Sequence, residues 1–589
     1  MDERVGDAIA DGMDWVFRQL RTAPRRLFGQ RAQQLPLHFR VLYKQFLLRV
    51  IDLESLSIEA DIPRFLGQFA GILIMFSLLR AVGMLFFPPP PAAALSIQQS
   101  QFSLMMLIAG LITVISWDSI FPDRRDVMIL APLPVRPHII LFAKLAASAG
   151  LIGLAIFCFN CASAFALCGL FAGPAGFLRL SFAWWFTMVA CSAFLFCAVL
   201  TVQGLTALLL PRSLFLRLSA LLQLVAFALF LGAYFLAPTL PSLTDFTASA
   251  NHTLVVRMPS YWFVALFNQL AGRLPFDLTW LATRAWIALG IVVTGAVASL
   301  LLCYTHTMKK IVEEPDLVPG AAGFHWVPRF GGSLPSAISL FSLRSITRSR
   351  QHRLALAFSW SVIFALALAW IRSELKTPPE PVNIDFLMST FLMMCFAVLG
   401  LRGVFSLPIS LHANWMLRVT QLRPTTKYLA ATRLCLLLFG VAPIWIVAAA
   451  FSFHFTPWQP ASRHLAFLAL TGWVLVELGL IRFYKVPFTC SYLPGKTNIQ
   501  VIFWGFGFVV FILGFTLANY EIGALTNLPQ YFTLMAFAAA AVAGLFAYNR
   551  VKASSAVLYF EELPPEIITR LGLVYVPPAK PASTRTSSN

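Results

Sequence analysis

Apolar runs of about 20 residues recur along the whole chain, separated by stretches that carry charge, proline or glycine. A helix needs about 20 apolar residues to cross the ~30 Å hydrocarbon core of a bilayer, so each run has the length of one transmembrane helix. About twelve such runs are present, and they cover residues 64–87, 102–121, 139–171, 181–210, 218–236, 279–306, 353–372, 386–407, 428–453, 464–484, 500–520 and 530–549.

The composition supports this interpretation. Hydrophobic residues make up 59% of the chain and charged residues 12%, which is about half the charge of a typical soluble domain, roughly 25%. A disordered chain is also excluded, because low hydrophobicity and abundant charge are what prevent collapse. We predict an all-α, polytopic integral membrane protein with about 12 transmembrane helices in two six-helix halves and with cytoplasmic interfacial helices. No cleavable signal pattern precedes the first run, so we expect the first span to stay in the mature protein.

The distribution of positive charge predicts the orientation. The chain has 44 Lys and Arg residues against 25 Asp and Glu residues, a formal net charge of +19. The basic residues recur in every second connecting segment, so the positive-inside rule predicts a protein of the cytoplasmic membrane with both termini in the cytoplasm. Because these residues are not gathered on one face among aromatic side chains, we expect the lipid bilayer and no nucleic acid as the partner of this charge.

The spacing of the runs divides the chain into five parts. Residues 1–63 are predicted to form cytoplasmic amphipathic helices in the membrane interface, and 64–307 the first six-span half. Residues 308–352 form a cytoplasmic linker with an interfacial helix, 353–549 the second six-span half, and 550–589 a cytoplasmic tail whose end is disordered. The segment Met258–Leu270 is too short to span and is expected at the outer interface.

The two halves suggest an internal duplication. The segments Leu133–Leu145 and Leu422–Leu434 align without a gap at an offset of 422 − 133 = 289 residues, and the same offset carries Arg64 onto Arg353. Six spans is an even number, so both halves would run in the same direction through the membrane, as parallel repeats.

Catalytic motifs are missing from the sequence. It contains no GxSxG or HExxH pattern, and the CxxC formed by Cys158 and Cys161 lies inside an apolar run without a second ligand pair. The segment Cys490–Thr497 ends like a phosphate-binding P-loop but has Cys490 where the first glycine is needed. We therefore expect no catalytic residues, no metal site and no cofactor, and we do not expect an enzyme.

Three charged residues lie deep within predicted spans, namely Arg80, Arg284 and Glu477. Charge at membrane depth often marks a functional site. Glu477 is the one carboxylate well inside a span. Either an arginine on a neighbouring helix pairs with it, or it has a role in binding substrate or protons.

Two cytoplasmic loops at matching points of the halves mix charge with apolar residues. Each could form a short amphipathic helix that docks on a cytoplasmic partner, or it could lie on lipid headgroups. The candidate residues are Asp126, Met128, Ile129, Leu130 and Arg136 in the first loop, and Trp415, Met416, Leu417, Arg418 and Arg423 in the second.

The order of these segments, together with Asp126–Pro137 and Lys144, resembles the permease of type 2 ATP-binding-cassette transporters. The segments Pro487–Lys496 and Tyr559–Glu562 are similar to segments of a group of uncharacterised bacterial two-halved permease-like proteins. The resemblance implies that the loop between spans two and three is a coupling helix seated on an ATPase subunit. Two departures are that the second half has no Asp at the position matching Asp126, and that a family chain usually has one six-span unit.

These observations predict a permease subunit that moves a substrate across the cytoplasmic membrane with separate ATP-binding-cassette ATPase subunits. An ion-coupled secondary transporter is the first alternative, and it would need embedded acids, of which Glu477 is the one that stands out. A membrane-integral enzyme is the second alternative, which the missing catalytic motifs disfavour.

Overall fold

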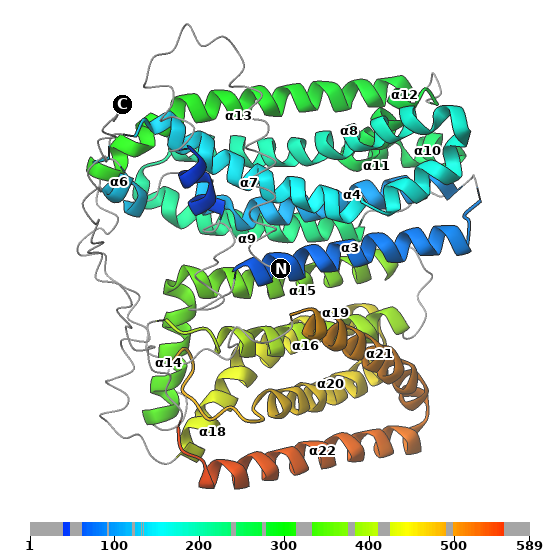
Figure 1. Ribbon diagram of the computed structural model, residues 1–589. Helices are drawn as coiled ribbons and strands as arrows, with labels where there is room; N and C mark the ends of the chain where they lie inside the picture. Colours follow the sequence, from blue (N-terminus) through cyan, green and yellow to red (C-terminus); the bar gives the residue numbers. More distant parts are fainter. Residues whose placement is uncertain are drawn as a thin grey trace, which may run out of the picture.

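The structure is a computed structural model, and it describes residues 39–47, 62–90, 93–120, 124–130, 132–133, 135–236, 243–273, 278–313, 333–374, 383–409, 425–489 and 499–558. The described residues form helices and no strand (Figure 1). A helix occupies each of the twelve apolar runs. In the first half of the chain these helices are α3 (Ile62–Phe86), α4 (Ala94–Ile115), α7 (Pro137–Asn160), α8 (Ser163–Leu209), α9 (Arg212–Leu236) and α13 (Thr279–Glu313).

Long helices also fill the second half of the chain. Its long helices are α15 (Arg350–Glu374), α16 (Ile384–Val404), α18 (Thr425–Leu436) continued through the π-helical turn η5 (Leu437–Val441) into α19 (Ala442–Phe455), α20 (Trp458–Gly479), α21 (Ile499–Thr526) and α22 (Leu528–Ser555). The shorter helices are α5 (Trp117–Ile120), α6 (Arg124–Leu130), α10 (Leu243–Thr247), η2 (Ser249–Asn251), α11 (His252–Arg257), α12 (Pro259–Ala271) and α14 (Ser333–Arg348), with one more helix over residues 39–47.

Nine helices within the described residues are long and apolar enough to cross a membrane. Leu221–Phe235 in α9 and Ala355–Leu368 in α15 add two shorter apolar helices. Backbone polar groups cannot be left unpaired in lipid, and a helix satisfies them within its own segment. The prediction of an all-α, multi-pass membrane protein is therefore confirmed.

The long helix α8 does not run straight. The indole Nε1 of Trp184 donates to Asn160 Oδ1 at 3.2 Å, and the rings of Phe165 and Phe177 stack at 6.5 Å. Twelve residues of straight helix would separate Phe165 from Phe177 by about 18 Å. The part of α8 before residues 172–175 and the part after them therefore pack side by side, and the first part extends α7 as the sequence predicts for a run ending at Phe171.

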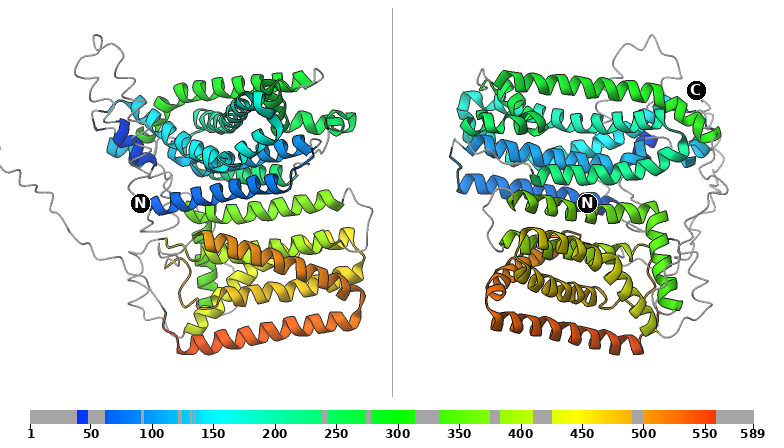
Figure 2. Two further views of the ribbon diagram at one scale, coloured as in Figure 1. Left: turned by 45° about the vertical axis from the view of Figure 1, so that its right-hand side comes forward. Right: turned by 180° about the vertical axis from the view of Figure 1, so that it is seen from behind.

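The helices form two groups, one above the other in Figure 1, and the two further views agree (Figure 2). The upper group holds α4, α7, α8, α9 and α13, and the lower group holds α16 and α18 to α22. Each group has its own apolar core. We call the end of the molecule that carries α6, α14 and the start of α18 the α6 end, and the opposite end, which carries α10 to α12, the α12 end.

The two groups meet through helices far apart in the sequence. Helix α9 packs along α15, where the Phe227 and Phe358 rings meet edge to face at 6.5 Å. Helix α3 packs against α21. α9 and α21 are the fifth long helices of their halves, and α3 and α15 are the first, so the two contacts are reciprocal.

Helix α12 is buried by its neighbours at the α12 end. The segment Met258–Leu270 was expected to lie on the outer interface, but the side chains of Tyr261, Phe263, Leu266 and Phe267 are at most 1% exposed. Packing against α13, α8 and α4 explains this burial. Hydropathy measures how apolar a segment is and not which helices will surround it, so this burial could not be predicted from the sequence.

Candidate functional site

The α6 end presents an anchored helix with two exposed apolar side chains. On α6, Val127 is 5% exposed, and Leu130 packs on the core formed by the 39–47 helix and α7. In contrast, Met128 is 62% exposed and Ile129 57%. Burying one such side chain is worth about 1.5–3 kcal/mol, so this pair, which we call the α6 ridge, is a surface that gains free energy when covered.

The other loop residues predicted from the sequence add little to this picture. Arg136 lies exposed at the N-terminal end of α7, and the side chain of Asp126 lies outside the described part of the chain. The whole second candidate loop also lies outside the described residues, including Trp415, Met416, Leu417, Arg418 and Arg423. The P-loop-like segment, residues 490–497, lies outside them as well.

Glu477 lies in the lower group and is fully buried. Arg433 on α18 donates from Nε to Oε1 at 2.5 Å and from Nη2 to Oε2 at 3.2 Å. Asn549 Nδ2 on α22 donates to Oε2 at 2.9 Å, and Trp473 Nε1 donates to Oε1 at 3.3 Å. The arginine is stacked over the Phe546 ring at 4.4 Å. Four donors on one carboxylate indicate a group that joins α18, α20 and α22, which is the first of the two roles considered for it.

Arg80 and Arg284 do not join Glu477. Arg80 on α3 donates to Ser100 Oγ at 3.3 Å and lies over the Phe159 ring at 5.8 Å. Arg284 on α13 is exposed and lies over the Trp280 ring at 5.1 Å. The three predicted charges therefore sit on three separate helices, and the structure does not bring them together into one site.

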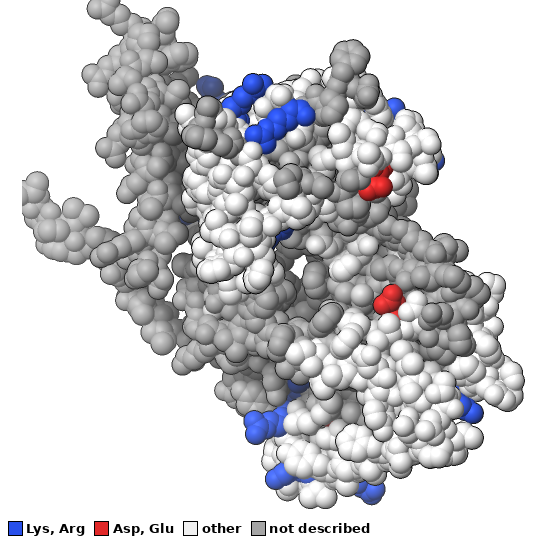
Figure 3. All heavy atoms as spheres, turned by 90° about the vertical axis from the view of Figure 1, so that its right-hand side faces the viewer, with Lys and Arg blue, Asp and Glu red and all other residues white. Residues whose placement is uncertain are grey.

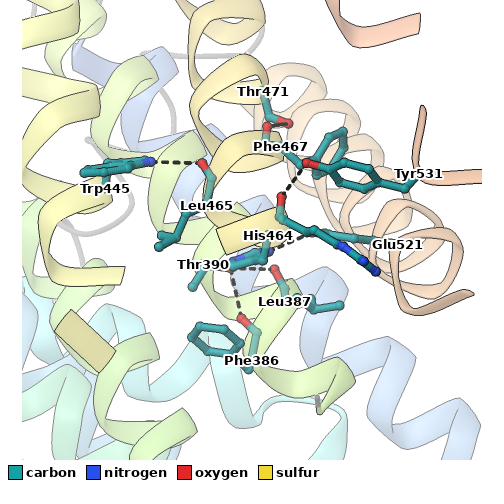
Figure 4. A network of polar contacts seen from close by, with 11 residues as sticks. Phe386, Leu387, Thr390, Trp445, His464, Leu465, Phe467, Thr471, Glu521 and Tyr531 are labelled. Carbon is teal, nitrogen blue, oxygen red and sulfur yellow. Dashed lines mark hydrogen bonds and ion pairs between the residues drawn. The ribbon is translucent and has the colours of Figure 1, made fainter. Parts of the chain in front are cut away.

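A second buried charged group, near the α12 end, was missed by the sequence analysis (Figure 4). His464 on α20 and Glu521 on α21 are 2% and 4% exposed, and His464 Nδ1 lies 2.7 Å from Glu521 Oε1. His464 Nε2 lies 3.2 Å from Thr390 Oγ1 on α16. The three side chains join three helices, and a small cavity of about 10 Å³ adjoins them, about the size of one water molecule.

Thr390 connects this group to helix α16. Its hydroxyl lies 3.0 and 2.9 Å from the carbonyls of Phe386 and Leu387 and 3.2 Å from His464 Nε2. A hydroxyl has one hydrogen and can also accept, so it can donate to one of these groups and accept from Nε2 when that nitrogen carries a hydrogen.

The surroundings of this pair carry one fixed positive charge. Arg463 donates to the Leu525 carbonyl at 2.5 Å, and its guanidinium lies 6.0 Å from the Tyr531 ring. The Tyr531 hydroxyl donates to the Arg463 carbonyl at 3.2 Å.

The predicted spans did not point to this pair. His464 is the first residue of the predicted span 464–484, and Glu521 lies one residue beyond the predicted span 500–520. A signal was available in the spacing of Ala518, Glu521 and Leu525, which is that of one buried helix face.

Potential metal ligands do not gather in the described part of the chain, where no group of three or more His, Cys, Asp or Glu side chains could hold a metal ion. The eight described cysteines are free thiols, and six of them are buried. Fold and site together define a multi-pass helical membrane protein whose described residues include the Glu477 group, the His464–Glu521 pair and the α6 ridge. Comparisons with models of protein families, with curated proteins and with solved structures give no match for this chain.

Proposed function

We propose that the chain is the permease subunit of an ATP-binding-cassette type transporter, which moves a substrate across the cytoplasmic membrane with separate ATPase subunits. The observation that carries this proposal is the α6 ridge. A helix that is fixed by Val127 and Leu130 and leaves Met128 and Ile129 exposed fits a surface that docks into a cleft of a partner. Helix α6 also contacts α13, so movement of a docked partner would be transmitted to a membrane-spanning helix.

A fused pair of six-span halves, about twelve spans in all, belongs to the same proposal. The reciprocal contacts of α9 with α15 and of α3 with α21 support it, since a two-fold related pair of halves makes each contact twice. The short helices agree as well. The 39–47 helix packs on α7, and α14 packs on α18. Helix α18 begins at Thr425, which is 289 residues after Arg136, the residue that directly precedes α7. The two short helices therefore pack on helices at matching positions of the halves.

We place the α6 end in the cytoplasm. Basic residues gather in the segments on this side, and the positive-inside rule applies to such segments. Figure 3 looks onto the α12 end, where most of the described surface is neither basic nor acidic. Both termini would then be cytoplasmic, and the ATPase subunits would meet the α6 ridge from inside the cell.

The test is a pull-down of the ATPase from detergent-solubilised membranes. Ile129→Asp should reduce the amount of ATPase recovered by about tenfold or more, since a charge on the ridge must be desolvated in the partner's cleft. Val41→Asp is the matched control, because Val41 is 55% exposed on the neighbouring 39–47 helix and lies off the ridge, so recovery should change little. Chain abundance must stay equal. Equal recovery with Ile129→Asp and wild type would mean that the ridge lies on lipid.

An ion-coupled secondary transporter is the second candidate, and the His464–Glu521 pair favours it. A buried histidine in contact with a buried carboxylate consists of two side chains that can each bind a proton, as a coupling site requires. The two candidates differ in what drives uptake or release by intact cells. Transport that stops when the proton gradient is collapsed while ATP is kept constant, and that stops in Glu521→Gln, would favour the second candidate over the first.

A further inference from the structure

A cavity of about 200 Å³ lies at the α12 end of the upper helix group, between α4, α8 and α12 and beside α10. Eleven of its fourteen lining residues are apolar. They come from these four helices and from Leu278 just before α13, and the lining is completed by three polar residues, Gln98, Asn268 and Arg273. Leu243 and Arg273 are the exposed members of the lining, so they mark the mouth of the cavity.

The polar residues offer hydrogen bonds that the protein does not use. Asn268 Nδ2 donates to Gln98 Oε1 at 2.8 Å and to the Val264 carbonyl at 2.9 Å. Gln98 and Asn268 are 7% and 9% exposed. The amide nitrogen of Gln98 has no acceptor among the described residues. Gln98 lines the cavity, so this donor is open to it and can bind a ligand with an acceptor oxygen.

Arg273 adds charge at the mouth. One of its Nη2 hydrogens is donated to the Phe171 carbonyl at 2.9 Å, and a guanidinium has five N–H groups, so others remain for a ligand. Arg273 is the one charged residue of the lining. A guanidinium group beside an apolar cavity favours an anionic head group.

We propose that this cavity binds the acyl chain of a carboxylate amphiphile, with its carboxylate between Arg273 and the Gln98 amide. The apolar wall receives the hydrocarbon tail. A cavity of about 150 Å³ holds the six carbons of benzene, so about 200 Å³ holds about eight carbons in proportion. A whole phospholipid is too large for it. The site concerns binding alone and stands apart from docking of an ATPase on the α6 ridge.

Photolabelling of the purified chain in detergent tests the proposal. The probe is octanoate with a diazirine near its last carbon, and the labelled residues are mapped by mass spectrometry. Label is expected in α4 around Leu95 and in α12 around Val264, and unlabelled octanoate should compete with it. The methyl ester of the same probe keeps the tail but lacks the charge, so it should label the same residues more weakly.

Four variants make the result decisive. Arg273→Gln should lower labelling by octanoate about tenfold and leave the methyl ester unchanged, because only the charged head uses the guanidinium. Ala265→Phe fills the cavity and should abolish both labels, and Ala94→Phe, at the half-buried start of α4, serves if Ala265→Phe does not fold. Ala250→Phe is exposed at the same end and should change neither label.

A further arm decides between a free acid and a lipid tail. The same diazirine chain carried by a phospholipid in vesicles is an ester and has no carboxylate, so it should label α4 and α12 far less than free octanoate does. Stronger label by octanoate supports the site, and equal label by the phospholipid would overturn it. Label spread over the lipid-facing helices, or label in α4 and α12 that survives both Arg273→Gln and the cavity-filling variants, would overturn it.

Discussion

The buried carboxylate of Glu477 illustrates how one residue can join three helices. Taking a carboxylate and a guanidinium out of water costs several kcal/mol for each ion, and the loss is offset only if the geometry is good and the remaining lone pairs are used. Here Arg433, Asn549 and Trp473 use them. The sequence predicted an arginine partner as one possibility. It could not say which arginine, because 44 residues separate the two in the chain.

Removing one member of this group should be costly. Glu477→Gln leaves the Arg433 guanidinium without its counter-charge, and breaking a buried pair in this way costs about 3–5 kcal/mol. We expect a large fall in the thermal unfolding midpoint of the detergent-purified chain. The double variant Arg433→Met, Glu477→Leu should fall by clearly less than the sum of its single variants.

The control is Arg284→Met. Its guanidinium is exposed and lies over Trp280, and such an exposed stacked cation contributes only about 0.5–1 kcal/mol. If Glu477→Gln and Arg284→Met shift the unfolding midpoint equally, then the Glu477 group is not the joint between α18, α20 and α22 that its hydrogen bonds indicate.

At the scale of helices, sequence reasoning succeeded where length and hydropathy decide. Each of the twelve apolar runs is helical, and α14 lies within the predicted linker region as an interfacial helix would. It failed where packing decides. The burial of α12 and the extension of α21 to Thr526, which brings Glu521 into the core, depend on neighbours distant in the sequence. The same holds for the candidate site. The apolar residues of α6 are neighbours in the sequence, so they could be predicted, whereas His464 and Glu521 lie on different helices, so their pairing could not.

Close packing of α8 on α13 depends on small residues. A Cβ on Gly204 would lie 2.7 Å from Ser299 Cβ, closer than real Cβ contacts allow. Gly204→Ala should therefore force the two helices apart and destabilise the fold by about 1–3 kcal/mol. Thermal unfolding of the purified variant measures this.

Gly290 on α13 is the matched control, since a Cβ there would meet nothing within 4 Å. Gly290→Ala should leave stability unchanged or raise it by up to about 1 kcal/mol, through helix propensity. Equal effects of the two substitutions would show that α8 and α13 are not in close contact at Gly204.

At the scale of the whole molecule, the two ends differ in charge and in the helices they carry. We expect Leu133→Cys at the α6 end to react with a membrane-impermeant maleimide only after permeabilisation, and Leu243→Cys at the α12 end to react in intact cells. Most described cysteines of the chain are buried, so background labelling should be low. Labelling of Leu133→Cys from outside would reverse the orientation.

If an ATPase bound to the α6 ridge drives this chain, ATP turnover must depend on that ridge. The measurement is ATP turnover by the purified chain in lipid vesicles, alone and with its co-purified ATPase subunit. We expect no turnover by the chain alone and turnover by the complex that is lost in the double variant Met128→Asp, Ile129→Asp. Turnover by the isolated chain, or a double variant as active in the complex as the wild type, would mean that no ATPase acts through the ridge.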